Sequence, residues 1–380
     1  MAESRGVGWA ALSYDRAAMN NIQSATKAST SARALLVRMP KAEIHLHLDG
    51  SLRPATGLEL ARARGLDEGM DMAAMRNRLV APERCLDQAD LLRAFDLPIA
   101  IMQDADALER VTAELVEDVA TDGTRYVEIR WAPALHLARG LSLRDSISAV
   151  VAGVRRGEAA VAGQVVVRLT AVAIRSHSPE TNLEVAIESA RFVDEGLTGF
   201  DFAGLEKLFP DPAPHLAAFE AARGGGLGIT IHAGEWDGAD QVRRALIVEP
   251  SRIAHGAPAA EDPALVAELI DRGVTLDMCL TSNVQTTCVP SLAAHPLARL
   301  ARAGAPVTLS TDDRTVSDLT LVREYERAHD VLGLSVAELW QINLHALRVA
   351  FLQHDEESRS RLIAEFEAFA AGEPELATRG

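Results

Sequence analysis

The stretch Ala42-Glu43-Ile44-His45-Leu46-His47-Leu48-Asp49-Gly50-Ser51 has the pattern of a buried β-strand that ends in a turn. Side chains two positions apart in a strand point to the same side, so His45 and His47 are expected to project together. An open, doubly wound sheet would favour a Gly-rich phosphate turn, G-x-G-x-x-G, after its first strand. No such turn follows Leu48, and this favours a closed barrel.

Seven more β-type runs follow along the chain, separated by helical patterns. The predicted strands cover residues 42–48, 125–131, 165–174, 197–202, 228–232, 252–255, 274–278 and 306–310. Strands that alternate with helices pair in parallel, and eight such units predict a single α/β domain, a (β/α)₈ TIM-type barrel, over residues 37–375. The interval 49–124 is too long for one crossover, so a helical cap insertion over the barrel mouth is expected there.

The first 36 residues differ from the rest of the chain. They are polar, rich in small residues and without a sustained hydrophobic period, so we predict a disordered N-terminal tail over residues 1–36. The segment lacks the apolar core of a secretory signal peptide. Met39 is an alternative start of the chain.

Charge and cysteine content narrow the classes of partner. The 380 residues include 38 Lys and Arg against 54 Asp and Glu, a formal net charge of −16. Such an acidic chain argues against nucleic-acid binding, which needs a concentrated basic face. No apolar run is long enough to span a membrane, and three cysteines in a long chain suit a reducing compartment. We therefore expect a cytoplasmic protein with a small-molecule substrate; its oligomeric state stays open.

Polar side chains recur where the predicted strands end. Strand five ends in His232 and is followed by Glu235, strand six ends in His255, and strand eight is followed by Asp312 and Asp313. Any one of these alone is most simply a satisfied polar group or a helix cap. Together they lie at the carboxyl ends of barrel strands, the face where barrel enzymes build their sites.

These residues are suited to hold a catalytic metal ion. His45, His47, His232 and Asp312 supply three nitrogens and one carboxylate, which is typical of a catalytic zinc site with one position left for water. Such a zinc ion turns water into a nucleophile near neutral pH. Glu235, three residues after His232, is then the expected general acid/base.

Several segments together resemble the adenosine deaminase family of the amidohydrolase superfamily. The motifs that carry the resemblance are Met39–Ser51, His232-Ala233-Gly234-Glu235, Arg252-Ile253-Ala254-His255-Gly256, Thr281-Ser282-Asn283 and Ser310-Thr311-Asp312-Asp313. They occur in the family's order between about Pro40 and Leu352. The resemblance implies a (β/α)₈ barrel, one zinc ion per chain and hydrolytic deamination of a 6-aminopurine.

The resemblance also implies a role for each matching residue. His45, His47, His232 and Asp312 would bind zinc, and Glu235 would protonate the purine N1 as hydroxide adds at C6. His255 would stabilise that hydroxide, Asp313 would hydrogen-bond N7, the Gly204 backbone N–H would meet N3, and Asp49 would bind the ribose 5′-hydroxyl. Trp236, after the Glu, departs from the pattern. His136 and His177, after strands two and three, are most simply ordinary residues of the rim; the alternative is that they contact the part of the substrate beyond the ribose.

Adenosine and 2′-deoxyadenosine are the expected substrates, giving inosine or 2′-deoxyinosine and ammonia. Deamination of 6-amino-6-deoxyfutalosine or adenine is the alternative, and a carboxylate on the former would need a basic partner. A binuclear amidohydrolase of another substrate class is a third interpretation. It would need a bridging carboxylated Lys at the end of strand four, but Lys207 lies beyond that strand. A cytidine-deaminase-type enzyme is disfavoured because its P-C-x-x-C signature is absent. A binding or signalling protein built on an inactive barrel should have lost at least one metal ligand or the general acid, and this sequence has kept them all.

Overall fold

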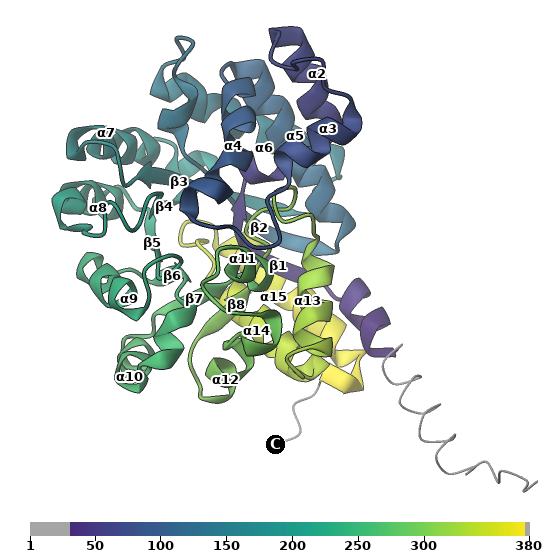
Figure 1. The fold of residues 1–380 in the computed structure, drawn as a ribbon. Coiled ribbons are helices and arrows are strands. Elements are labelled where there is room, and N and C mark those ends of the chain that lie inside the picture. Colours follow the sequence, from purple (N-terminus) through teal and green to yellow (C-terminus); the bar gives the residue numbers. More distant parts are fainter. Residues whose placement is uncertain (1–30, 377–380) are drawn as a thin grey trace, which may run out of the picture.

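The computed structural model describes residues 31–376 and contains eight strands arranged as a barrel (Figure 1). Neighbouring strands pair in parallel in the order β1 to β8. The strands are β1 (Lys41–His47), β2 (Thr124–Trp131), β3 (Val166–Ile174), β4 (Leu197–Ala203), β5 (Gly228–Ala233), β6 (Arg252–His255), β7 (Thr275–Met278) and β8 (Val307–Leu309). Each overlaps one predicted strand, which confirms the predicted (β/α)₈ architecture.

The barrel closes between β1 and the segment that follows β8. The His47 backbone N donates to the Asp312 carbonyl at 2.7 Å, and the Asp312 N donates to the His45 carbonyl at 3.1 Å. These bonds form a parallel bridge between Leu46 and Asp312. The junction that closes the barrel therefore fixes the backbone of three of the four predicted metal ligands.

Helices surround the strands and connect them (Figure 1). The helices are α2 (Pro54–Arg64), α3 (Met72–Leu79), α4 (Gln88–Ile101), α5 (Ala105–Thr121), α6 (Leu143–Ala160), α7 (Pro179–Ala190), α8 (Leu216–Gly224), α9 (Ala239–Ala245), α10 (Pro263–Arg272), α11 (Leu280–Gln285), α12 (Leu297–Arg302), α13 (Leu321–Asp330), α14 (Val336–Arg348) and α15 (Glu356–Ala371). Helix α5 illustrates the local logic. Asp104 caps its first turn by accepting from the Ala107 N–H, and Gly123 follows it in a left-handed conformation (φ 76°).

The interval between β1 and β2 holds four helices with different positions. Helix α5 packs against β2 and α6 in the ring of barrel helices. Helix α4 instead lines the cavity at the barrel mouth, where it contributes Gln88, Leu91, Leu92, Phe95 and Ile99. The part of the chain that caps the mouth is therefore narrower than the predicted 49–124.

The predicted tail boundary also differs from the structure. Residues 1–30 lie outside the described residues, but residues 31–38 form a helix. Leu35 and Leu36 in this helix are fully buried against the main core. Burial of apolar surface stabilises a short helix that its composition alone does not predict, so the prediction of disorder is wrong for residues 31–36.

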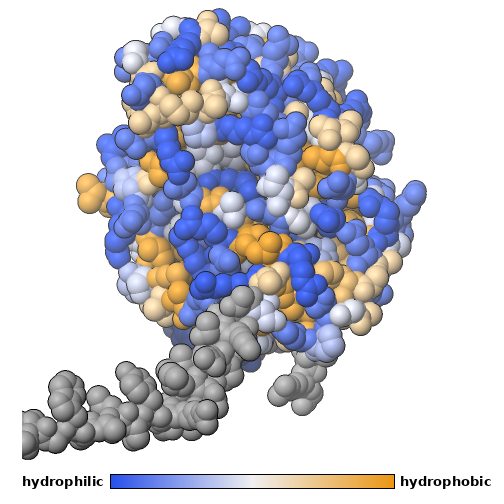
Figure 2. Space-filling model, turned by 90° about the vertical axis from the view of Figure 1, so that its right-hand side faces the viewer, coloured by the Kyte–Doolittle hydropathy of each residue, from blue (hydrophilic) through white to orange (hydrophobic). Residues whose placement is uncertain are grey.

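The surface seen in Figure 2 is largely hydrophilic, with small apolar patches scattered between charged side chains. This pattern agrees with the acidic composition, because charged groups gather outside while the barrel and its helices bury the apolar ones. Among the described residues, no helix is both long and apolar enough to cross a membrane.

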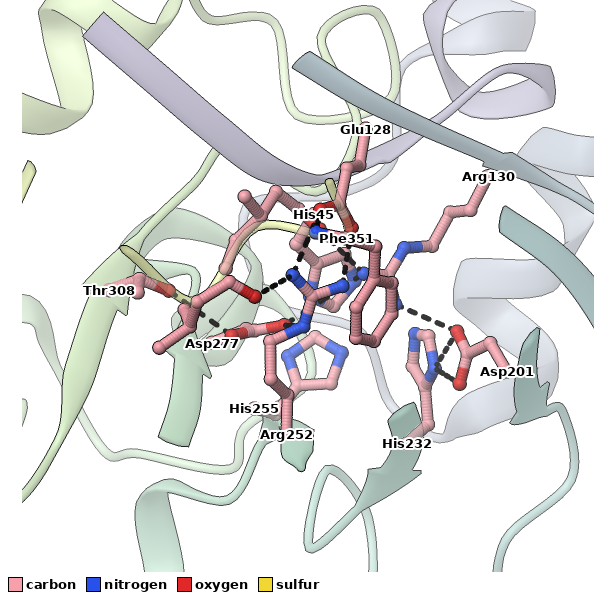
Figure 3. A network of polar contacts seen from close by, with 12 residues as sticks. His45, Glu128, Arg130, Asp201, His232, Arg252, His255, Asp277, Thr308 and Phe351 are labelled. Carbon is pink, nitrogen blue, oxygen red and sulfur yellow. Dashed lines mark hydrogen bonds and ion pairs between the residues drawn. The ribbon is translucent and has the colours of Figure 1, made fainter. Parts of the chain in front are cut away.

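The barrel interior also contains a buried ionic network, below the ends of the strands (Figure 3). Arg252 on β6 forms an ion pair with Glu128 on β2, and its guanidinium carbon lies 3.6 Å from the centre of the Phe351 ring. Gly199 and Gly228 make room for Phe351, since a Cβ at either position would lie 2.8 Å or 2.3 Å from that ring. This end of the barrel is filled and sealed.

Candidate active site

The structure brings together the four residues that the sequence nominates as metal ligands. His45 and His47 lie on β1, His232 lies near the end of β5, and Asp312 follows β8. One ligand atom from each falls within 4.8 Å of the others. Since the four come from three strand ends, the cluster exists only because the barrel closes.

Burial favours the neutral form of His45 and His47, which is the form that binds metal ions. Burial lowers the pKa of His45 well below its usual value and that of His47 to about 3. Nε2 of His47 and Nε2 of His232 face each other at 3.3 Å. His45 Nε2 lies 3.0 Å from Asp312 Oδ1 but makes no hydrogen bond to a described residue. Converging nitrogens beside a carboxylate are what a bound cation would satisfy.

A second set of buried charges orients His232. Its Nδ1 lies 2.9 Å from Asp201 Oδ2, and the same oxygen accepts from Arg130 at 2.7 Å, so Figure 3 shows both side chains meeting Asp201. Burial alone would raise the pKa of Asp201, but His232 and Arg130 hold it well below its usual value. Because Nδ1 donates to this carboxylate, Nε2 keeps its lone pair toward the cluster. The strand pattern did not reveal Asp201 or Arg130 as partners of this histidine.

The turn that follows His232 aims Glu235 at the cluster. Glu206 accepts from the backbone N–H of Gly234 at 2.6 Å and of Trp236 at 2.8 Å. Gly234 has φ 76°, and a Cβ there would approach Val242 within 2.7 Å. Sequence reasoning missed Glu206, which fixes both ends of this turn.

Trp236, which the family pattern does not explain, has a packing role here. Its side chain is 9% exposed and belongs to a small apolar cluster with Ala81, Cys85, Leu91, Ala94 and Val316. Leu91 and Ala94 are on α4. Trp236 therefore anchors the Glu235 turn against the cap.

Burial raises the pKa of three carboxyl groups at the mouth. Burial, followed by the charges of Asp312 and Glu206, raises the pKa of Glu235 well above its usual value. Burial and the neighbouring Asp312 and Asp49 do the same for the pKa of Asp313. Burial raises the pKa of Asp49 to about 6. Perturbed acids gathered in one pocket are typical of a site for proton transfer.

Close packing fixes two of these acids. An added Cβ at Gly50 would lie 1.6 Å from Asp313 Oδ1, so only glycine permits this approach. Asp313 Oδ1 and Asp49 Oδ1 are buried and have no hydrogen-bond partner among the described residues. Two buried carboxyl oxygens without a partner are costly unless a ligand satisfies them.

His255 and Asp312 both have the left-handed backbone conformation, with φ of 64° and 68°. Residues other than glycine rarely adopt it, and it costs on the order of 1–3 kcal/mol where surrounding structure imposes it. Cys279 joins these two in a second group of possible ligand atoms, which shares Asp312 with the first cluster.

One cavity connects these groups. Its wall includes the cluster residues His47, His232 and Asp312, the acids Asp49, Glu235 and Asp313, and also His255 and Gly204. Gly204, after β4, has φ 111°, and its carbonyl accepts from Gln88 of α4 at 2.9 Å. The remaining wall is apolar and comes mainly from α4 and from the ends of β2, β3 and β4.

The two residues expected at the substrate rim are not part of the cavity wall. His136 is fully buried, and its Nδ1 lies 2.8 Å from the Met102 carbonyl. His177 is half-buried in the turn after β3. Arg175, also near that turn, donates to the carbonyls of Phe209 and His232. The structure therefore gives no support to a substrate contact by His136 or His177.

Comparison with known proteins agrees with this geometry. The family model described as adenosine deaminase matches residues 40–368. An adenosine deaminase of Mycobacteroides abscessus is 39% identical over 339 residues, covering 84% of this chain and 92% of that protein. Among solved structures, the N6-mAMP deaminase of Arabidopsis aligns with a TM-score of 0.79 at 29% identity, over 88% of this chain and 99% of that one. The adenine deaminase of Arthrobacter aurescens aligns with a TM-score of 0.79 at 26% identity, over the same shares. The chain therefore belongs to the adenosine deaminase family, metal-dependent hydrolases that deaminate purines by acting on carbon–nitrogen bonds of cyclic amidines.

Proposed function

We propose that this enzyme uses one zinc ion to deaminate adenosine and 2′-deoxyadenosine to inosine and 2′-deoxyinosine, releasing ammonia. The observation that carries the proposal is the cavity wall. It combines a cluster of metal-ligating side chains with acids whose pKa burial raises, and lacks, among its described residues, any lysine or arginine.

His45, His47, His232 and Asp312 would hold the metal ion, and their donor set fits zinc. Three imidazole nitrogens with one carboxylate differ from the cysteine-rich ligand sets of structural zinc sites. They leave one coordination position for water or substrate. When bound, the ion supplies an activated water as the nucleophile. Asp201 and Arg130 hold His232 in the orientation and tautomer that a ligand needs.

Glu235 and Asp313 are proposed to handle the purine ring. A carboxyl group that keeps its proton near neutral pH can protonate N1 of the ring as C6 is attacked, and the raised pKa of Glu235 supports this role. Asp313 can in the same way donate to N7, because its pKa is also raised. The Gly204 backbone is proposed to meet N3.

The charges of the wall favour a neutral substrate. Asp49, Glu235, Asp312 and Asp313 all face the cavity, and no cationic side chain accompanies them among the described lining residues. A phosphate or a remote carboxylate would enter a partly desolvated site whose described wall offers no cationic partner. This disfavours AMP derivatives and 6-amino-6-deoxyfutalosine. Arg175, the arginine that follows β3, already donates to two backbone carbonyls.

Adenine is the second candidate substrate, and Asp49 discriminates it from adenosine. The unpartnered Oδ1 of Asp49 lies in the cavity wall as an acceptor for a ribose hydroxyl. A binuclear mechanism is disfavoured because Asp201, at the strand-four position, is occupied by His232 and Arg130. Lys207 lies beyond the strand and is exposed.

A substrate screen tests the proposal. Adenosine, 2′-deoxyadenosine, adenine, AMP, N6-methyl-AMP and 6-amino-6-deoxyfutalosine are compared by the change in purine absorbance and by ammonia release. We expect the two neutral nucleosides to have the highest kcat/KM. A higher kcat/KM for a phosphorylated or carboxylated substrate, or for free adenine, would refute the substrate assignment. Metal analysis of the same preparation should give one zinc per chain.

A further inference from the structure

A chain of buried hydrogen bonds runs away from the cavity behind His255. Nδ1 of His255 lies 3.0 Å from Asn283 Nδ2, and Asn283 Oδ1 lies 3.0 Å from His295 Nε2. The chain ends at the backbone, where the Leu297 N–H donates to His295 Nδ1 at 3.2 Å. His255 and Asn283 are fully buried and His295 is 5% exposed, so water has little access to these bonds.

The direction of every hydrogen bond in this chain follows from its backbone end. The Leu297 N–H can only donate, so Nδ1 of His295 must accept. Burial lowers the pKa of His295 to about 3, and its neutral ring therefore carries its one hydrogen on Nε2. That N–H requires an acceptor, which sets the Asn283 amide with Oδ1 toward His295 and NH₂ toward His255.

The same logic determines the state of His255. Because the Asn283 NH₂ donates to Nδ1 of His255, Nδ1 must be unprotonated and the ring hydrogen must lie on Nε2. Nε2 faces the cluster, 3.8 Å from Asp312 Oδ2 and 3.9 Å from Glu235 Oε1. It has no hydrogen-bond partner among the described residues, so this N–H is free to donate to a group that enters between the two carboxylates.

We propose that Asn283 and His295 are positioning residues that hold His255 as its Nε2–H tautomer, so that it donates a hydrogen bond to the attacking oxygen. The role in catalysis rests on the proposed function, whereas the tautomer rests on the hydrogen-bond chain alone. An Nε2 that carries hydrogen has no lone pair for a metal ion. The hydrogen-bond chain through Asn283 and His295 therefore also keeps His255 from binding the metal ion, although His255 lies beside Asp312.

The fold holds Asn283 firmly enough for this role. Its backbone N–H donates to the Cys279 carbonyl at 2.9 Å, and its carbonyl accepts from the Val289 N–H at 3.0 Å. Both the backbone and both ends of the amide are thus engaged. Rotation of the amide would break two buried hydrogen bonds at once.

The first test reads the tautomer directly, without substrate. The zinc-loaded enzyme is labelled with ¹⁵N-histidine, and the His255 signals are assigned by their loss in the His255→Gln variant. We expect a hydrogen-bearing Nε2 and an unprotonated Nδ1. A hydrogen on Nδ1 of His255 in the unsubstituted enzyme would overturn the proposal, whatever the enzyme's activity.

The second test reverses the tautomer of His255 by changing Asn283. In Asn283→Asp the introduced carboxylate accepts from both imidazoles, which favours its ionised form and moves the His255 hydrogen to Nδ1. We expect kcat to fall by ~10²–10⁴-fold, the range for acid–base groups and for a reversed histidine tautomer, while zinc content stays near that of the parent. A reversed tautomer with unchanged kcat would overturn the proposal.

The chain offers a matched control outside the cavity wall. Asn182 Nδ2 lies 3.0 Å from His215 Nδ1, an equally buried Asn–His pair that does not line the cavity. Asn182→Asp should lower thermal stability as Asn283→Asp does but leave kcat close to that of the parent. If no 6-aminopurine is deaminated by the parent, the proposed function fails and the NMR result still decides the tautomer.

Discussion

At the base of the barrel, Arg252 is paired with Glu128 and stacked on Phe351, whereas the acids at the mouth face a cavity whose described wall residues include no lysine or arginine. Glu128 accepts from Arg252, from the Tyr126 hydroxyl and from the Phe351 N–H. At the mouth, Asp49 and Asp313 each have a buried oxygen without a partner among the described residues. The Arg252–Glu128 pair at the base is thus hydrogen-bonded within the protein, although Arg252 Nε and Asp277 Oδ2 beside it lack a hydrogen-bond partner in the described part of the chain, whereas the acids at the mouth have no cationic partner among the described wall residues.

This contrast separates stability from function within one fold. Paired groups at the base contribute to the stability of the folded state, since removing one partner leaves a buried charge uncompensated. Unsatisfied groups at the mouth cost stability and are retained where a ligand satisfies them. Substitutions at the two ends should therefore be distinguishable by whether they change stability or turnover.

The largest effect is expected from removing a metal ligand at the mouth. His45→Ala should lose most of the bound zinc and with it most of the activity, because the three ligands that remain of the four bind the ion too weakly. Metal content per chain, measured beside kcat, checks this outcome. Full zinc occupancy in the variant would show that His45 is not a ligand.

Glu235→Gln should separate metal binding from proton transfer. The amide keeps the size and a hydrogen bond but has no transferable proton, so kcat should fall by ~10²–10⁴-fold with zinc retained. Asp237→Asn, the same change at the exposed acid two positions later, should leave kcat close to that of the parent. Retention of more than about a tenth of the parent kcat by the Gln variant lies outside that range and would exclude Glu235 as the proton donor.

A substitution at the base of the barrel should lower stability rather than turnover. Glu128→Ala leaves the fully buried Arg252 unpaired, so we expect the free energy of unfolding to fall by ~3–5 kcal/mol. Chemical denaturation measures this loss, and kcat per folded molecule should change little. The double variant Glu128→Leu/Arg252→Met, which removes both charges, should recover part of the stability. No recovery would mean that the Tyr126 and Phe351 contacts of Glu128 dominate.

Substrate selectivity tests one unsatisfied group at the mouth. If Asp49 binds the 5′-hydroxyl, 5′-deoxyadenosine should have a kcat/KM below that of adenosine by roughly 5- to 150-fold, since an unpaired buried acceptor costs ~1–3 kcal/mol. In Asp49→Ala the two substrates should become nearly equal. A difference that persists in the variant would assign the hydroxyl to another residue.

The smallest effect is expected away from both ends, at Glu338 on α14. A hydrogen bond from Arg302 lowers the pKa of Glu338 to about 2. Because this folded-state pKa lies below the ordinary value of 4.5, the stabilisation is present above that value and disappears as pH falls toward 2. Glu338→Gln should cost ~0.2–1 kcal/mol near neutral pH, as exposed ion pairs do, and less in acid. A loss of stability that does not depend on pH would show that Glu338 acts through its helix-capping hydrogen bonds rather than through its ion pair with Arg302.

The sequence by itself determined the architecture and the residues that meet at the mouth. Period-two alternation and turn residues are local signals, so strands such as β1 and β5 could be located from the printed residues alone. Since parallel barrel strands all end on one face, placing His45, His232 and Asp312 at strand ends was enough to predict that they converge.

Only the tertiary structure decided which side chains orient those residues and which merely pack. Asp201 reaches His232 from the neighbouring strand, Glu206 holds the turn at Glu235, and His295 acts on His255 through Asn283. Such partners are separated by tens of residues and follow no periodicity. The helix over residues 31–38 was missed for a related reason: its stability comes from burying Leu35 and Leu36 on the core, and burial is a property of the folded chain rather than of a local segment.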